Sequence, residues 1–242
     1  MFFPLFRITG VFLAVPLIGS RLVPVRSRLA LALLVSLILS PIIKIPAYAE
    51  MSLSLLPLIL QEFVIGYIIG FLFQILFQIF VIAGQIIAIQ NGLGFGMMVD
   101  PVNGINVVSI SQLYLIFINI IFFSMNGHLM VFEILYHSFI FLPMGSWLAA
   151  LHYYKIAQLG SWMFMSAFLV SISAVLAIFL SNITFGFISR LSPQFNIFSV
   201  GFPFNMIFGL FIIMLTMVNV VPQFDVLYQF VVEYLIEFMR ST

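Results

Sequence analysis

The chain has 242 residues, of which 64% are hydrophobic and only 6% are charged. Soluble domains carry about 25% charged residues, so eight Lys or Arg and seven Asp or Glu cannot cover a water-soluble globule. The high apolar content excludes intrinsic disorder, and a formal net charge of +1 does not indicate a nucleic-acid partner. The absence of cysteine rules out disulfides and thiolate chemistry. The composition predicts an integral membrane protein, or a subunit that partners cover on nearly every side.

Apolar runs follow one another along the chain, separated by charged or turn-forming residues. They cover about residues 4–19, 28–43, 53–89, 107–125, 129–142, 159–188 and 201–221, and a closing helix covers about 225–240. A spanning helix needs about 20 mostly apolar residues, so six of the seven runs could span and only 129–142 is too short alone. Strands of a β-barrel would alternate apolar and polar side chains, whereas these runs are apolar on every face. The predicted fold class is all-α, a polytopic helical membrane protein.

The long run 53–89 carries a row of small and polar side chains, here called the Gly/Gln row. It consists of Gly66, Gly70, Gln74, Gln78 and Gln85. Steps of four, four, four and seven residues place the row on one face of a helix. Glycines permit a close backbone approach, and glutamine in hydrocarbon needs a partner. The row is therefore predicted to contact protein or water. Packing within the chain, a subunit interface and a wet lumen are the alternatives, and all five residues are subunit-interface candidates.

Two acidic residues, Glu62 and Glu133, border apolar runs. An acidic side chain inside a membrane is a candidate for proton handling, whereas one at a helix end is an ordinary interfacial residue. The sequence leaves both interpretations open for each of them.

The closing helix is amphipathic. Acidic or amide side chains recur every four residues from Asp225 to Glu237, and apolar side chains fill the other side. Pro222 and Asp225 are typical of a helix start. Such a helix is predicted to lie on the membrane surface or to dock on a neighbouring subunit.

The segment of residues 90–106 is irregular and yet apolar. It combines alternating glycines with the turn signals Asp100-Pro101 and Asn103-Gly104, which disfavour a helix. An apolar irregular loop cannot face lipid, because its backbone groups would lack hydrogen bonds. The loop is therefore predicted to lie inside protein or to line a cavity.

The sequence contains no recognisable catalytic or metal-binding constellation. The spacing of the three histidines, His128, His137 and His152, does not suit a metal, and the motifs of hydrolases, zinc proteases and phosphate-binding loops are absent. We therefore expect no catalytic residues, no metal site, no cofactor and no enzyme activity.

Three motifs carry a family resemblance through their order and spacing. They are QNGLGFGMMVDPVNGINVVSISQLY at residues 90–114, MNGH at 125–128 and ISRLSPQFNIFSVGFP at 188–203. Together they resemble the FliR/SctT family of type III export-gate proteins, and its flagellar branch more than its virulence branch. The resemblance covers nearly the whole chain, including its length and its FRITGVFLAVPLIG start.

The resemblance implies a structural and gating subunit of the flagellar type III protein-export channel. About residues 1–155 would be FliP-like, and about 156–242 would form a FliQ-like helical hairpin. The chain would join FliP- and FliQ-like subunits in a hetero-oligomer, with a FlhB-like protein on the cytoplasmic side. Unfolded export substrates would pass through this assembly, which would contact lipid in the bacterial inner membrane at the flagellar basal body.

The resemblance also implies that the loop of about residues 94–106 plugs the closed channel. The matching residues are Gly94, Phe95, Gly96, Met97, Met98, Val99, Asp100, Pro101, Asn103, Gly104, Ile105 and Asn106. Glycines let such a loop rearrange, and methionines pack adaptably. Asp100 and Arg190 are the least expected charges in the motifs. We expect each to have a polar partner in the closed assembly, with each other as one option, and the alternative for Arg190 is a helix-end side chain that reaches the membrane surface.

Three other functions are alternatives. A polytopic small-solute transporter fits the apolar runs, although the sequence lacks a detectable inverted repeat and a charged substrate site. The equivalent subunit of a virulence injectisome would share the motifs. An intramembrane enzyme lacks a catalytic constellation.

Overall fold

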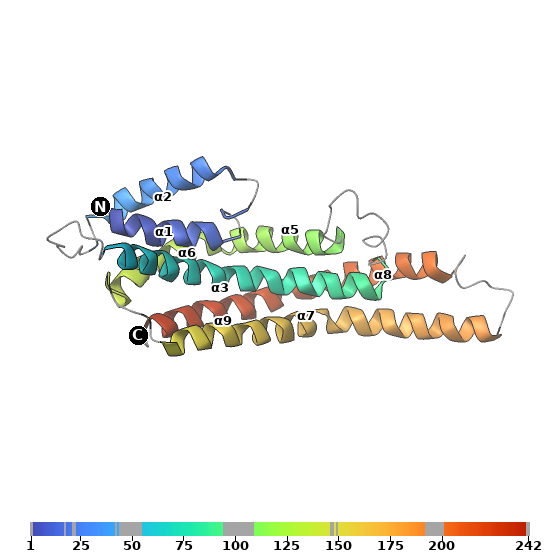
Figure 1. Cartoon of the computed structure of the whole chain (residues 1–242). Coiled ribbons are helices and arrows are strands. Elements are labelled where there is room, and N and C mark those ends of the chain that lie inside the picture. The colour runs from blue at the N-terminus through green and yellow to red at the C-terminus, as the bar shows by residue number, and fades with distance from the viewer. Residues whose placement is uncertain are drawn as a thin grey trace. The chain divides into compact units, whose positions relative to one another are not determined.

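The computed structural model describes residues 2–16, 18–20, 23–41, 43, 55–93, 109–145, 148, 150–191 and 201–240. Within these ranges the chain forms helices and short turns without any strand (Figure 1). The helices are α1 (Phe2–Ala14), α2 (Val25–Leu39), α3 (Leu55–Gln90), α5 (Ser109–Ser124), α6 (Gly127–Phe141), α7 (Ala150–Leu191), α8 (Phe202–Thr216), the 3₁₀ turn η2 (Met217–Asn219) and α9 (Val220–Arg240). The predicted all-α class is confirmed.

The helix boundaries differ from the predicted ones mainly at α7 and α9. α7 begins at Ala150, well before the apolar run 159–188, because a helix can continue through polar residues that lower the hydropathy. α9 begins at Val220 rather than at Asp225. Pro222 lies in the first turn of α9, where a missing N–H removes no intrahelical hydrogen bond. The predicted start signals therefore lie inside the helix.

Fewer helices can cross a bilayer than the sequence predicted. By length and composition, three segments of the described residues qualify: α3, α7 and the run Pro203–Arg240 through α8, η2 and α9. α5 and α6 would add a fourth if both were one broken span. α1 and α2, with 13 and 15 residues, fall short of the roughly 20 that a span needs. The count of six candidate spans is therefore wrong, because turn residues at the ends of the apolar runs shorten these helices.

The helices belong to two compact units that interleave along the sequence. The first comprises residues 1–77, 122–160 and 228–242, and the second comprises 78–121 and 161–227. The predicted division near residue 155 into a FliP-like and a FliQ-like part rests on resemblance to other proteins and stays a prediction.

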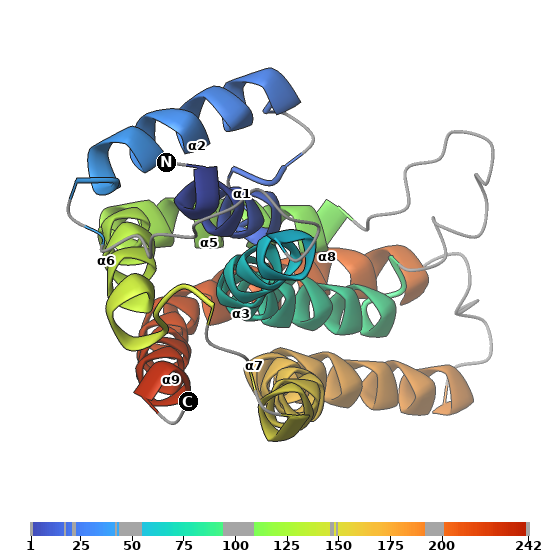
Figure 2. The same cartoon turned by 60° about the vertical axis from the view of Figure 1, so that its left-hand side comes forward.

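The first unit contains α1, α2, α6 and the beginning of α3. Figures 1 and 2 both show α1 between α2 and α3. α1 is deeply buried, with Ile8, Val11 and Phe12 at most 1% exposed. In α2 only Ala32 and Ser36 are buried. α1 is therefore a core helix of this unit, and α2 is a peripheral one.

α1 and α3 approach each other closely at two glycines. A Cβ atom on Gly66 would overlap the main-chain carbonyl of Arg7. A Cβ on Gly70 would lie 2.6 Å from the carbonyl oxygen of Val11. Both positions require glycine because the backbone of α1 occupies the space that any side chain would need.

The C-terminal part of α9 also packs inside the first unit. Its apolar stripe is buried, with Tyr228, Val231, Leu235 and Phe238 at most 8% exposed. The ring of His152 meets the ring of Phe238 edge-on at 5.3 Å. The amphipathic pattern thus reflects packing within the chain, which corrects the prediction of a membrane-surface or docking helix.

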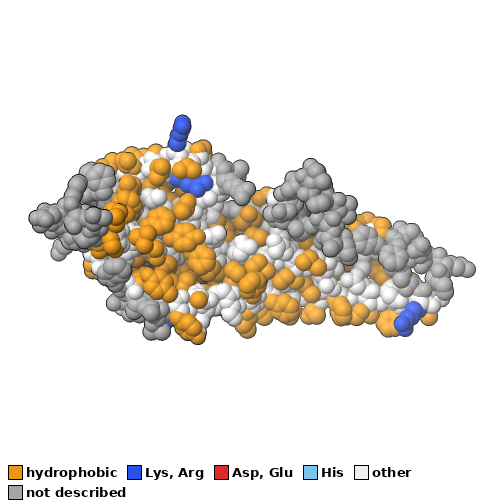
Figure 3. Space-filling view, in the orientation of Figure 1, with side chains coloured by type: hydrophobic (Ala, Val, Ile, Leu, Met, Phe, Trp, Pro, Cys, Tyr) orange, Lys and Arg blue, Asp and Glu red, His pale blue; other side chains and the backbone are white. Residues whose placement is uncertain are grey.

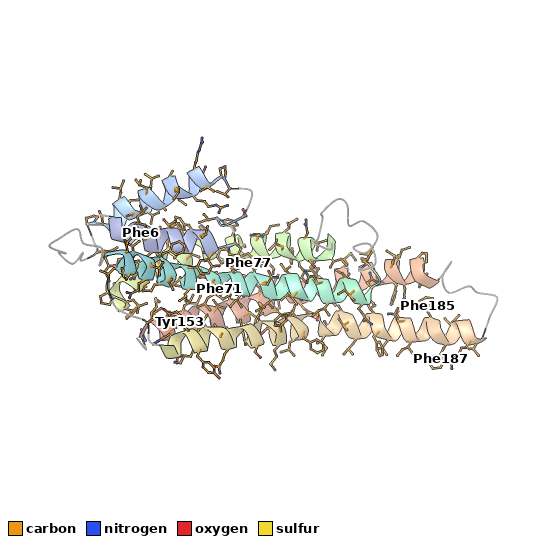
Figure 4. All side chains as sticks on the ribbon, in the orientation of Figure 1. Phe6, Phe71, Phe77, Tyr153, Phe185 and Phe187 are labelled. Carbon is orange, nitrogen blue, oxygen red and sulfur yellow. The ribbon has the colours of Figure 1, made fainter. Side chains whose placement is uncertain are left out.

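The second unit contains α5, α8 and the remaining parts of α3, α7 and α9. Aromatic contacts connect its helices. The ring centroids of Phe80 in α3 and Phe224 in α9 are 5.7 Å apart. The ring centroids of Phe185 in α7 and Phe204 in α8 are 5.1 Å apart. Figure 4 shows Phe185 on the side of α7 toward α8 and Phe187 on the outer side, where it is 62% exposed.

Apolar side chains also cover much of the described surface. On the face shown in Figure 3, hydrophobic side chains predominate over the few basic ones. Large apolar residues are exposed along α2, α7 and α8, among them Leu34, Ile38, Phe164, Leu180, Ile207 and Met214. Soluble monomers rarely expose so much contiguous apolar surface. Lipid or other protein chains must therefore cover these helices.

Candidate functional site

The predicted plug loop, residues 94–106, lies outside the described residues, and the structure describes the segments before and after it. α3 ends at Gln90, and a Schellman motif follows it: the N–H of Gly92 donates to Ile89 O at 3.1 Å and that of Leu93 to Ala88 O at 3.0 Å. Gly92 has a φ of 78°, a left-handed conformation that favours glycine. The first glycine of the motif therefore ends the helix, as its sequence predicts.

The segment that follows the loop returns to α3. α5 begins at Ser109, and a Cβ on Gly84 of α3 would lie only 2.8 Å from the Cα of Ser111. Gly84 thus allows the first turn of α5 to rest directly on the α3 backbone. The described segments before and after the loop thus both contact the last two turns of α3.

Polar side chains connect the end of α3 to α7 and α8 inside the second unit. Asn205 of α8 donates its amide to the side-chain oxygen of Asn182 of α7. Asn182 in turn donates to the main-chain oxygen of Gln90 at 3.5 Å. Ser181 donates its hydroxyl to Asn205 Oδ1 at 2.7 Å. Three helices thereby share one chain of hydrogen bonds.

Asn91 adds a second polar connection from the end of α3 to α8. Its side chain is 4% exposed, and Nδ2 donates to Met206 O at 3.3 Å. Its amide occupies the space that a Cβ on Gly209 would need. We refer to Asn91, Asn182 and Asn205 as the asparagine cluster. This cluster was not predicted from the sequence, although isolated asparagines in or beside apolar runs were the available signal.

Glu62 forms a buried ion pair with Arg7 in the first unit. Arg7 Nε lies 2.8 Å from Glu62 Oε2, and the two side chains are 0% and 1% exposed. Arg7 also donates to the main-chain oxygens of Ser138 and Leu142 at 2.8 and 3.0 Å, and so caps the C-terminal end of α6. Glu62 is therefore paired with Arg7 inside the first unit rather than lying at an exposed helix end, and proton handling stays a hypothesis.

Glu133 is in a different environment from Glu62. Its side chain is 60% exposed, and its carboxylate lies 4.0 Å from His137 Nε2 one helical turn away. This arrangement agrees with an interfacial residue on an exposed helix face.

The Gly/Gln row of α3 divides into two parts. A Cβ on Gly66 or Gly70 would meet the main chain of α1 in the same chain, which favours the alternative of packing within the chain. Their assignment to a subunit interface stays a prediction. Gln74 is exposed, and Gln78 and Gln85 are partly buried. The three glutamines likewise stay predicted subunit contacts.

The predicted pair of unexpected charges is only half described. Arg190 is exposed in the last turn of α7, whereas Asp100 lies outside the described residues. Whether each has a polar partner in an assembly stays a prediction. Among the described residues, no group of three or more His, Asp or Glu side chains could hold a metal ion.

Helices long enough to cross a bilayer, with apolar faces and a buried ion pair, define a polytopic helical membrane protein. Residues 1–231 match the family described as "Bacterial export proteins, family 1", and the chain belongs to this family. The predicted family resemblance is thereby confirmed.

Several known proteins are similar in sequence to this chain over most of their own length. "Flagellar biosynthetic protein FliR" of Escherichia coli is 27% identical over 91% of this chain and 85% of its own. The protein of the same name from Aquifex aeolicus is 29% identical over 88% and 83%. "Surface presentation of antigens protein SpaR" of Shigella flexneri is 22% identical over 86% and 81%.

Proposed function

We propose that the chain is a structural and gating subunit of the type III protein-export channel of the bacterial flagellum. The family match over residues 1–231 carries this proposal. Relatives named as flagellar biosynthetic proteins, at 27% and 29% identity, favour the flagellar apparatus over the injectisome. The relative SpaR is less similar, at 22% identity.

The exposed apolar helices support a role within a larger assembly. α7 and α8 present large apolar side chains that neighbouring helices or lipid must cover. We propose that FliP- and FliQ-like subunits cover them in a hetero-oligomer, and that a FlhB-like protein binds on the cytoplasmic side. The assembly forms in the inner membrane at the flagellar basal body and transports unfolded proteins. The subunit performs no catalysis.

Within this assembly, residues 94–106 form the plug of the closed channel. Two contacts support this role: the Schellman motif at Gly92 fixes the start of the loop, and Gly84 holds the first turn of α5 after it. Arg190 is exposed in the single chain. In the closed assembly it pairs with Asp100 or with a group on another subunit, and the alternative is a helix-end side chain that reaches the membrane surface.

Deletion of residues 94–106 tests the plug. When the deleted chain is co-expressed with its FliP- and FliQ-like partners, we expect the cell membrane to leak ions, because no segment seals the lumen. A membrane-potential dye measures the leak, and the Gly160→Ala variant serves as a control because a Cβ there would contact nothing within 4 Å. An assembled complex that shows no ion leak without the loop would contradict the proposal that the loop plugs the channel.

A further inference from the structure

The asparagine cluster lies at the C-terminal end of α3, where apolar packing alone would leave the position of α3 along α7 and α8 undetermined. The surrounding residues of the second unit are apolar, with Ala83, Ile87 and Ala88 fully buried. Apolar burial has no preferred direction, so helices packed only by such residues can slide along each other. Hydrogen bonds are directional and need matched positions on both helices. Asn91 is 4% exposed, and Asn182 and Asn205 are partly buried. Asparagine side chains in an otherwise apolar helix interface accordingly specify register.

Two hydrogen bonds of the cluster involve the end of α3. Asn182 of α7 reaches the main-chain oxygen of Gln90, and Asn91 reaches the main-chain oxygen of Met206 in α8. Asn205, which lies beside Met206 in α8, donates a hydrogen bond to Asn182 and so connects α8 to α7. The three residues thus connect the end of α3 to two helices that lie 92 and 115 positions further along the chain at the points of contact.

We propose that the asparagine cluster is a positioning site, which holds the C-terminal end of α3 in one register against α7 and α8 and thereby determines how tightly the closed channel seals. This inference rests on the proposed gating function and adds to it the residues that set the closed state. Asn91, Asn182 and Asn205 do not contact the transported protein in this role. They act through the position of α3.

Gly209 provides an independent way to disturb the cluster. An alanine there would occupy the space of the Asn91 amide, so Gly209→Ala displaces Asn91 with a single methyl group and leaves all three asparagines in place. Asn182→Leu removes the central hydrogen bonds at nearly constant volume. Thr184→Val is the matched control, because Thr184 lies on the same helix and donates only to Leu180 O of its own helix at 2.9 Å.

The test compares these variants with the deletion of residues 94–106, each co-expressed with the FliP- and FliQ-like partners. Two quantities are measured: the amount of assembled complex and the ion leak per complex. We expect Asn182→Leu and Gly209→Ala to assemble in normal amounts and to leak several-fold more than the wild type, while Thr184→Val behaves as the wild type.

Each other outcome overturns the proposal in a recognisable way. If the deletion leaks while Asn182→Leu and Gly209→Ala assemble and stay tight, the cluster has no positioning role and the proposed function survives. If both variants lose the complex, the cluster is merely structural. If even the deletion stays tight, the gating function fails and the inference fails with it.

Discussion

Replacing Glu62 with leucine is expected to destabilise the folded chain by about 3–5 kcal/mol, because the Arg7 guanidinium then stays buried without its counter-charge. Arg7 cannot reach water from its position, since it is 0% exposed and is held by the end of α6. Thermal unfolding of the purified protein in mild detergent, followed by circular dichroism, measures the loss.

Two further variants test the cause of this loss. Glu133→Leu is the matched control, because this glutamate is 60% exposed and its removal should change stability by less than about 1 kcal/mol. The double variant Arg7→Leu/Glu62→Leu removes both charges and should recover part of the stability, since apolar replacements of a buried pair are often tolerated. A Glu62→Leu protein as stable as the wild type would show that the pair is open to solvent.

Gly66→Val is expected to separate α1 from α3 and to destabilise the chain by about 3 kcal/mol or more. A side chain at this position meets the main chain of Arg7 rather than a flexible side chain, so no rotamer change can relieve the overlap. The same shift would lengthen the Arg7–Glu62 ion pair. Limited proteolysis and thermal unfolding of the purified variant measure the effect.

Gly160 supplies the control for the glycine substitution. It lies in helix α7, and a Cβ there would meet nothing within 4 Å. Gly160→Ala should therefore leave the protein unchanged or stabilise it by up to about 1 kcal/mol, as expected for glycine in a helix interior. Equal effects of both substitutions would mean that α1 and α3 are not in close contact.

The sequence predicted the helical class because the apolar runs are long and lack the alternation of strands. It predicted the end of α3 because Gly92 is required in a left-handed turn. It overestimated the number of spans because hydropathy ignores where turns shorten a helix. It also misplaced the start of α9, because proline is tolerated in a first helical turn as well as before one.

The candidate site was predicted less completely than the fold, because its contacts join residues that are distant in sequence. Arg7 and Glu62 are 55 positions apart, and periodicity within a run gives no information on such a pair. Arg7 was not among the predicted site residues, although a lone arginine in an apolar run requires a partner. The glycines of the Gly/Gln row illustrate the same limit: their spacing indicates a close contact but not whether the neighbour is α1 or another subunit.

Native mass spectrometry of the tagged chain, co-expressed with FliP- and FliQ-like partners and purified in mild detergent, tests the central claim most directly. The account predicts a defined hetero-oligomer that contains one copy of this chain, because α7 and α8 leave apolar faces for partner helices to cover. A stable monomer or homo-oligomer that ignores both partners would contradict the assignment as an export-gate subunit and would favour a self-sufficient transporter.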